Sequence, residues 1–168
     1  ECLKRKSPRI PGYDYSTNGA YFITICTHNK KPIFGPVGAD SISARMVKDT
    51  FLKCIQKYPQ VSVPIYTVMP NHFHAIITIN RADMESAPTI SEVVRDFKRY
   101  STLEYIKMVK SGVIPPFDGK VWQRSFHDHV IRDDAGYLKI WNYIEGNPSK
   151  WEEDCFYVKE GYFERQKT

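Results

Sequence analysis

The stretch Val68-Met69-Pro70-Asn71-His72-Phe73-His74-Ala75-Ile76-Ile77-Thr78-Ile79 decides the fold. Residues rich in β-branched and aromatic side chains lie on both sides of Met69-Pro70-Asn71, and this composition is typical of strands. Proline and asparagine between two such runs are typical of a tight turn. The sequence therefore predicts a β-hairpin with strands over residues 61–69 and 72–80.

The second strand of this hairpin has two chemically different faces, because side chains alternate along a strand. One face is apolar and must lie under helices; it carries Phe73, Ala75, Ile77 and Ile79. The other face carries His72 and His74. Two imidazoles about 7 Å apart along one strand can both reach a single divalent ion. An HxH triplet alone fits two ordinary strand histidines equally well.

The remaining elements follow outward from the hairpin. Residues 20–28 and 121–132 have the composition and alternation of strands. An apolar stripe over 43–58, the capping box of Thr89 and Glu92 before 89–110, and a cap at Asp133 or Asp134 before 135–146 predict three helices. The order β-α-β-β-α-β-α predicts an α+β fold. We expect a ferredoxin-like split βαβ sandwich, with a four-stranded antiparallel sheet, two helices on one face and an extra C-terminal helix.

The 168 residues are enough for one domain with flanking segments. Residues 1–18 read as a basic, proline-containing N-terminal arm, 19–152 as the folded domain, and 153–168 as an aromatic and charged tail. The net charge of +5 favours a polyanionic partner. Apolar runs are far shorter than the ~18 residues of a membrane span, and no secretory segment follows the basic arm. We therefore expect a cytoplasmic, nucleoid-associated protein with no membrane partner.

A tyrosine and an amide lie one helical turn apart on the last predicted helix. Tyr143 and Asn147 are spaced i, i+4 on the flank of the stripe that Tyr137, Ile140, Trp141 and Ile144 form. They can present a hydroxyl and a carbonyl oxygen to one point. Taken alone, the pair is better explained by a packed aromatic ring at Tyr143 and a helix-capping role for Asn147.

Three ordered blocks together resemble the single-tyrosine HUH transposases, and among them the REP-associated tyrosine transposases, a branch of the IS200-like family. The blocks are Val-Met-Pro-Asn-His-Phe-His (68–74), Trp-Gln-Arg-Ser-Phe-His-Asp-His-Val-Ile-Arg (122–132) and Tyr-Ile-Glu-Gly-Asn-Pro-Ser-Lys-Trp (143–151). The opening run from Gly12 to His28 is also similar, so the resemblance spans roughly residues 4–152. Three blocks at compatible spacing are far more specific than an HxH triplet.

The resemblance implies a function and a set of site residues. It implies a metal-dependent single-stranded DNA endonuclease and strand transferase that acts on hairpin-bearing DNA through a 5′-phosphotyrosine intermediate. Residues 19–152 would then be the catalytic domain, with Tyr143 as nucleophile, His72 and His74 as metal ligands and Asn147 as third ligand. Relatives tend to have glutamine at that last position, and Pro148 disfavours helical geometry at Asn147. A mixed nitrogen and oxygen shell suits Mg²⁺ or Mn²⁺.

The DNA partner implied by the resemblance is a REP-like palindrome, that is, a hairpin with single-stranded flanks. Three groups of basic residues are candidates for binding it: the arm residues Lys4, Arg5, Lys6 and Arg9, the helix residues Arg95, Lys98 and Arg99, and Arg124 and Arg132 beside the fourth strand. His127 and His129 have a candidate accessory role, although packing beside Trp122 and Phe126 is the favoured interpretation. Relatives include both monomers and homodimers, and the sequence is compatible with both a monomer and a homodimer.

Two other functions fit the same residues. A non-cutting protein derived from a transposase would bind DNA hairpins without metal or tyrosine chemistry. A zinc-stabilised protein would use His72, His74, His127 and His129 as one four-histidine site, although structural zinc sites usually recruit cysteine. The four cysteines, Cys2, Cys26, Cys54 and Cys155, form no CxxC pair, so no zinc knuckle is expected.

Overall fold

The computed structural model describes residues 19–37, 40–80 and 87–159. Its element order confirms the predicted one. The strands are β1 (Gly19–Cys26), β2 (Val61–Met69), β3 (His72–Ile79) and β4 (His127–Ile131), and the helices are α1 (Ile42–Ile55), α2 (Ile90–Lys110) and α3 (Asp134–Gly146). Two 3₁₀ segments, His28–Lys30 and Pro148–Glu153, follow β1 and α3. The basic arm, with Lys4, Arg5, Lys6 and Arg9, lies outside the described residues.

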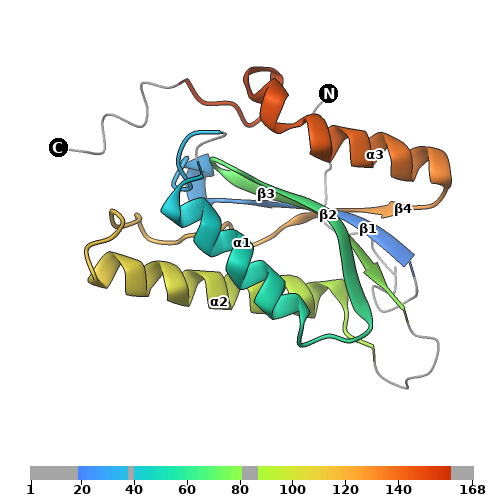
Figure 1. Cartoon of the computed structure of the whole chain (residues 1–168), viewed down its shortest axis with the longest axis horizontal. Coiled ribbons are helices and arrows are strands. Elements are labelled where there is room, and N and C mark those ends of the chain that lie inside the picture. The colour runs from blue at the N-terminus through green and yellow to red at the C-terminus, as the bar shows by residue number, and fades with distance from the viewer. Residues whose placement is uncertain (1–18, 38–39, 81–86, 160–168) are drawn as a thin grey trace.

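The four strands form one antiparallel sheet in the order β2-β3-β1-β4. Helices α1 and α2 lie side by side on one face of this sheet, and α3 crosses the other face (Figure 1). This is the ferredoxin-like split βαβ arrangement with an added C-terminal helix, as the sequence predicts. The histidine-bearing strand β3 is central, with β1 and β2 as its neighbours.

The alternation along β3 divides the core into two layers. Phe73, Ala75 and Ile77 are fully buried in the large core beneath α1 and α2. Ile76, on the opposite face, belongs to a small core with Phe22, Ile131 and Ile144, packed by half-buried side chains of α3. Helix α3 therefore covers the sheet face that carries the histidines.

The helix starts follow from local chemistry. In α2, the Glu92 N–H donates to Thr89 Oγ1 (3.2 Å) and the Thr89 N–H donates to Glu92 Oε2 (2.7 Å), which is the predicted capping box. In α3, the Asp133 side chain accepts from the Gly136 N–H at 2.7 Å, so Asp133 rather than Asp134 is the cap. In the described part of the chain, no helix is long and apolar enough to cross a membrane.

The fourth strand is shorter than predicted. Residues 121–126 contribute only an isolated bridge between Trp122 and Thr27, and β4 begins at His127. The Lys98 ammonium donates to the three backbone carbonyls of Gln123, Arg124 and Ser125 at 2.8, 3.2 and 3.0 Å. Carbonyls that converge on one ammonium cannot also point toward a neighbouring strand in a regular hydrogen-bond ladder. The alternation of side chains in the sequence therefore predicts a longer strand than the one that forms.

Candidate active site

His72 and His74 lie side by side on β3, with their ring centroids 4.5 Å apart. Both are buried, at 0% and 1% exposure. In each ring, Nδ1 has a neighbour on the sheet side: Asn71 Oδ1 lies 2.9 Å from His72 Nδ1, and Thr24 Oγ1 lies 2.9 Å from His74 Nδ1. These contacts leave both Nε2 atoms on the side of the rings that faces away from them.

Tyr143 projects from α3 toward this pair. Its hydroxyl lies 3.4 Å from His74 Nε2, and its ring contacts His74 (5.4 Å between centroids) and the edge of Phe22 (6.0 Å). The side chain remains 43% exposed. The structure thus brings together the strand histidines and the helix tyrosine, which the sequence places far apart.

Asn147 ends α3 one turn beyond Tyr143 and is 3% exposed. Its backbone is helical (φ −59°, ψ −42°) in spite of Pro148, because the chain continues directly into a 3₁₀ segment with proline at its start. The Asn147 amide donates through Nδ2 to Asp154 Oδ2 at 2.6 Å. Its Oδ1 is buried and has no hydrogen-bond partner among the described residues.

Asp154 is a site residue that the sequence did not reveal. The 3₁₀ segment Pro148–Glu153 folds the tail back over the sheet and places the Asp154 side chain, 1% exposed, inside the site. Asp154 Oδ2 lies 3.4 Å from the Tyr143 hydroxyl and 4.0 Å from His72 Nε2. The tail has no pattern that distinguishes this aspartate from neighbouring Glu152 and Glu153, so only the fold identifies it.

The site favours neutral imidazoles. Burial lowers the pKa of His72 to about 3, an effect that its contact with the Asn147 amide opposes and that the nearby Lys30 charge reinforces. Burial, and then the neighbouring His72, hold the pKa of His74 well below its usual value. A neutral ring keeps a nitrogen lone pair for coordination. Desolvation, followed by the Asp154 carboxylate, raises the pKa of Tyr143 to about 12, so the resting phenol is protonated.

These residues fit a divalent cation. One ligand atom from each of His72, His74 and Asp154 lies within 4.8 Å of the other two. His72 Nε2 and Asn147 Oδ1 are both buried acceptors without a hydrogen-bond partner in the described ranges. An ion bound among them would satisfy acceptors that are otherwise costly to bury. The donor set is two imidazole nitrogens with carboxylate and amide oxygens.

The buried neutral histidines predict an acid-sensitive fold. An unfolded imidazole takes up a proton below its ordinary pKa of 6.5, whereas folded His72 does so only near 3. The free energy of unfolding should therefore fall as pH drops from 6.5 toward 3, by about 1.4 kcal/mol per pH unit for this group. Thermal unfolding of metal-free protein over this range measures it. His72→Gln should reduce the slope and exposed His127→Gln should not; equal slopes would contradict the prediction.

His127 and His129 lie on the same sheet face as His72 and His74, but they are not close enough to join their cluster. Thr24 of β1 pairs with His74 on one side and with His127 on the other, so two strand spacings, about 10 Å, separate these histidines. Both β4 histidines are exposed, so the expected packing beside Trp122 and Phe126 is wrong. The four-histidine zinc site is not formed either.

The basic residues of α2 are not brought to the site. Helix α2 covers the opposite face of the sheet from the histidines (Figure 1). Lys98 holds the carbonyls of the 123–125 loop, and exposed Arg95 lies 3.4 Å from Asp96, while Arg99 is exposed. These three candidate DNA-binding residues therefore lie on the other side of the sheet from the histidines. Arg124 and Arg132 are exposed before and after β4.

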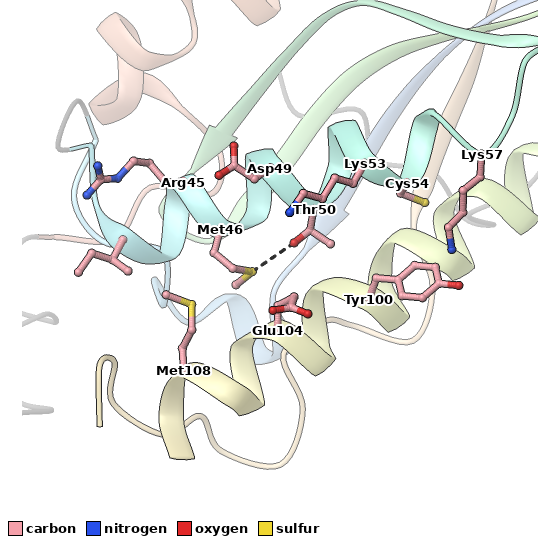
Figure 2. Close-up of a pocket in the computed structure, with 11 residues that line it drawn as sticks. Arg45, Met46, Asp49, Thr50, Lys53, Cys54, Lys57, Tyr100, Glu104 and Met108 are labelled. Carbon is pink, nitrogen blue, oxygen red and sulfur yellow. Dashed lines mark hydrogen bonds between the residues drawn. The ribbon is translucent and has the colours of Figure 1, made fainter. Parts of the chain in front are cut away.

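A groove of about 630 Å³ lies between α1 and α2, as Figure 2 shows. Met46 and Met108 give it apolar walls, and Lys57 places its ammonium 3.7 Å from the centre of the Tyr100 ring. Because both helices cover the face opposite the histidines, the sheet separates this groove from the candidate active site.

Comparisons with known proteins identify a family and relatives that this chain resembles. A profile of the family described as "Transposase IS200 like" matches residues 16–147. An uncharacterized protein of Haemophilus influenzae is 34% identical, with 92% of this chain and 93% of that protein covered. A second protein of that organism, provisionally named a REP-associated tyrosine transposase, is 27% identical, with 90% and 77% covered.

Two solved structures share the fold. A REP-associated tyrosine transposase bound to a REP hairpin superposes with a TM-score of 0.62 at 21% identity, covering 84% of this chain and 74% of that one. A protein of Deinococcus radiodurans provisionally named a transposase gives a TM-score of 0.51 at 18% identity, covering 82% and 95%. At these identities the likeness concerns the fold.

Proposed function

The chain belongs to the IS200-like transposase family, and on that premise we propose that it is a metal-dependent single-stranded DNA endonuclease and strand transferase. Its substrate is DNA that carries a hairpin, and its intermediate is a 5′-phosphotyrosine. One observation carries the proposal: the Tyr143 hydroxyl lies 3.4 Å from both His74 Nε2 and Asp154 Oδ2, at a site whose buried acceptors fit a cation.

Tyr143 is the proposed nucleophile. Its phenol oxygen bonds to the phosphorus of a DNA phosphodiester as the bond from phosphorus to the 3′ oxygen breaks. The phenol proton is lost and the departing 3′ oxygen gains one, so the products are a 5′-phosphotyrosine and a free 3′-hydroxyl. A phenolate is a good leaving group, so a 3′-hydroxyl can attack the phosphotyrosine and rejoin strands without ATP. The free energy of the cleaved bond is thereby conserved.

His72, His74 and Asp154, together with the Asn147 oxygen, are the proposed holders of the cation. When bound, Mg²⁺ or Mn²⁺ supplies positive charge that stabilises the non-bridging phosphate oxygens in the transition state. Imidazole ligands beside oxygen ligands favour Mn²⁺ over Mg²⁺, which prefers oxygen. Two imidazoles and an amide carry no negative charge. The Asp154 carboxylate adds one to the ligand set, and this strengthens cation binding.

A hairpin-bearing DNA is the proposed partner. The structural relative of the same fold is bound to a REP hairpin, and the net charge of +5 suits a polyanion. Among the described basic residues, exposed Arg124 and Arg132 at the two ends of β4 are the proposed phosphate contacts. Because Tyr143 reaches His74 of its own chain, one chain supplies the whole proposed site, and we propose that a monomer is sufficient for cleavage.

The proposal is tested with hairpin oligonucleotides whose single-stranded flanks are randomised, so that the recognised bases need not be known. With Mn²⁺, a 3′-end label is expected to move into a protein adduct that survives denaturation. A 5′-end label should appear in a shortened fragment that a polymerase can extend from its 3′-hydroxyl. A chelator should prevent both products.

A native gel of the same mixtures, which preserves non-covalent complexes, tests the alternative function. Hairpin binding that survives the chelator, with no adduct under any metal, would identify a non-cutting DNA-binding protein and overturn the proposal. Adduct formation with a 3′-labelled oligonucleotide that lacks the hairpin would contradict hairpin recognition but not the proposed cleavage chemistry.

A further inference from the structure

We propose that Asn71 is a positioning residue, which fixes the tautomer of His72 so that its Nε2 lone pair faces the site. The inference rests on the proposed function, in which His72 is a metal ligand. Asn71 forms the turn between β2 and β3 and is fully buried. The sequence indicates only a turn-forming role for Asn71. Its side chain, however, makes three hydrogen-bonding contacts, two to distant segments and one to His72.

The contacts of Asn71 fix the orientation of its amide. Nδ2 lies 3.1 Å from the Lys30 carbonyl oxygen and 2.7 Å from the Phe156 carbonyl oxygen. A carbonyl oxygen can only accept, so the atom that faces these two must be the NH₂ group. The amide therefore cannot be turned over without losing both bonds, and Oδ1 must be the atom that faces His72.

The orientation of the amide then decides which His72 nitrogen carries the proton. Oδ1 can only accept, and it lies 2.9 Å from His72 Nδ1, so Nδ1 must donate. A neutral imidazole carries one ring proton, so a ring with that proton on Nδ1 has its lone pair on Nε2. That Nε2 is one of the buried side-chain atoms for which the described part of the chain offers no hydrogen-bond partner.

The loop after β1 is built to meet this amide. Asn29 and Lys30 both have φ of 54°, a left-handed conformation that residues other than glycine rarely adopt. The Lys30 carbonyl accepts from Asn71 Nδ2, and the Asn71 carbonyl accepts from the Thr27 N–H at 2.9 Å. A strained backbone conformation persists only where surrounding contacts hold it. At Asn29 and Lys30, these contacts include the hydrogen bond between the Lys30 carbonyl and the Asn71 side chain that orients His72.

The same amide also anchors the segment that carries Asp154. The Phe156 carbonyl accepts from Asn71, the Phe156 N–H donates to Asp154 Oδ1 at 2.7 Å, and the Phe156 ring lies 4.7 Å from the His72 ring. Asn71 therefore positions two of the proposed ligands: His72 by a direct hydrogen bond, and Asp154 through Phe156. Residues that orient metal ligands in this way typically change metal affinity 10- to 100-fold when they are replaced.

Histidine ring signals test the proposal without metal or DNA. In protein labelled with ¹⁵N-histidine, two-bond ¹H–¹⁵N spectra distinguish the tautomers of each ring. We expect His72 to carry its proton on Nδ1 in the unaltered protein and to shift toward the other tautomer in Asn71→Ala. Thr24→Val, which removes the corresponding neighbour of His74, should change the His74 signals and leave those of His72 in place.

Mn²⁺ titration, followed by the electron paramagnetic resonance signal of the free ion, provides the second readout. Asn71→Ala should bind Mn²⁺ about 10- to 100-fold more weakly. A proton on Nε2 in the unaltered protein, an unchanged His72 signal in Asn71→Ala, or a shift of both rings in every variant would overturn the proposal. If the unaltered protein binds no Mn²⁺, the proposed function fails, whereas the ring signals still decide the role of Asn71.

Discussion

Tyr143→Phe is expected to abolish the covalent adduct between the protein and hairpin DNA, with a loss of at least about 10³-fold. Phenylalanine keeps the ring that contacts His74 and Phe22 but lacks the oxygen that would bond to phosphorus. The measurement is the 3′-label in the denaturing gel, read over a long time course with Mn²⁺.

Tyr137→Phe is the matched control, because Tyr137 lies on the same helix, packs against Trp141 and belongs to the small core on this face. It should form the adduct as the unaltered protein does. Tyr143→Phe should still bind the hairpin and unfold at a similar temperature, because the hydroxyl is the only group removed. An adduct that persists in Tyr143→Phe would remove this residue from the nucleophile role.

The fold was predictable because its determinants are local. The alternation along β3, the turn at Pro70, and the capping box of Thr89 and Glu92 each involve residues close in sequence, and each forms as expected. The β4 boundary was wrong because it depends on a distant side chain, Lys98, which takes the carbonyls that a longer strand would need.

The candidate site was predictable only where the side-chain periodicity of a strand or helix places two residues on the same face. The i, i+2 spacing of His72 and His74 and the i, i+4 spacing of Tyr143 and Asn147 place each pair on one face, and the resemblance joined the two pairs. Asp154 has no such partner in sequence. It reaches the site because the tail folds back after α3, and that path depends on tertiary contacts such as the bond between Asn71 and the Phe156 carbonyl.

Asp154→Asn is expected to weaken Mn²⁺ binding by at least about 10-fold. The substitution keeps the size of the side chain and removes a negative charge that lies 4.0 Å from His72 Nε2 in a buried site, where charge interactions are little screened. Mn²⁺ titration measures the affinity, and adduct formation should need correspondingly more metal. Glu153→Gln removes the same charge from the adjacent, exposed position and should leave the affinity unchanged.

The tyrosine offers an independent readout of the same substitution. Because the Asp154 carboxylate contributes to raising the pKa of Tyr143 to about 12, Asp154→Asn should lower that pKa, although desolvation, the larger cause, remains. Ultraviolet titration of Asp154→Asn against Asp154→Asn/Tyr143→Phe isolates this one phenol. A lowered Tyr143 pKa with unchanged Mn²⁺ affinity would show that the carboxylate faces the tyrosine without binding the cation, and the ligand set would then reduce to His72, His74 and Asn147.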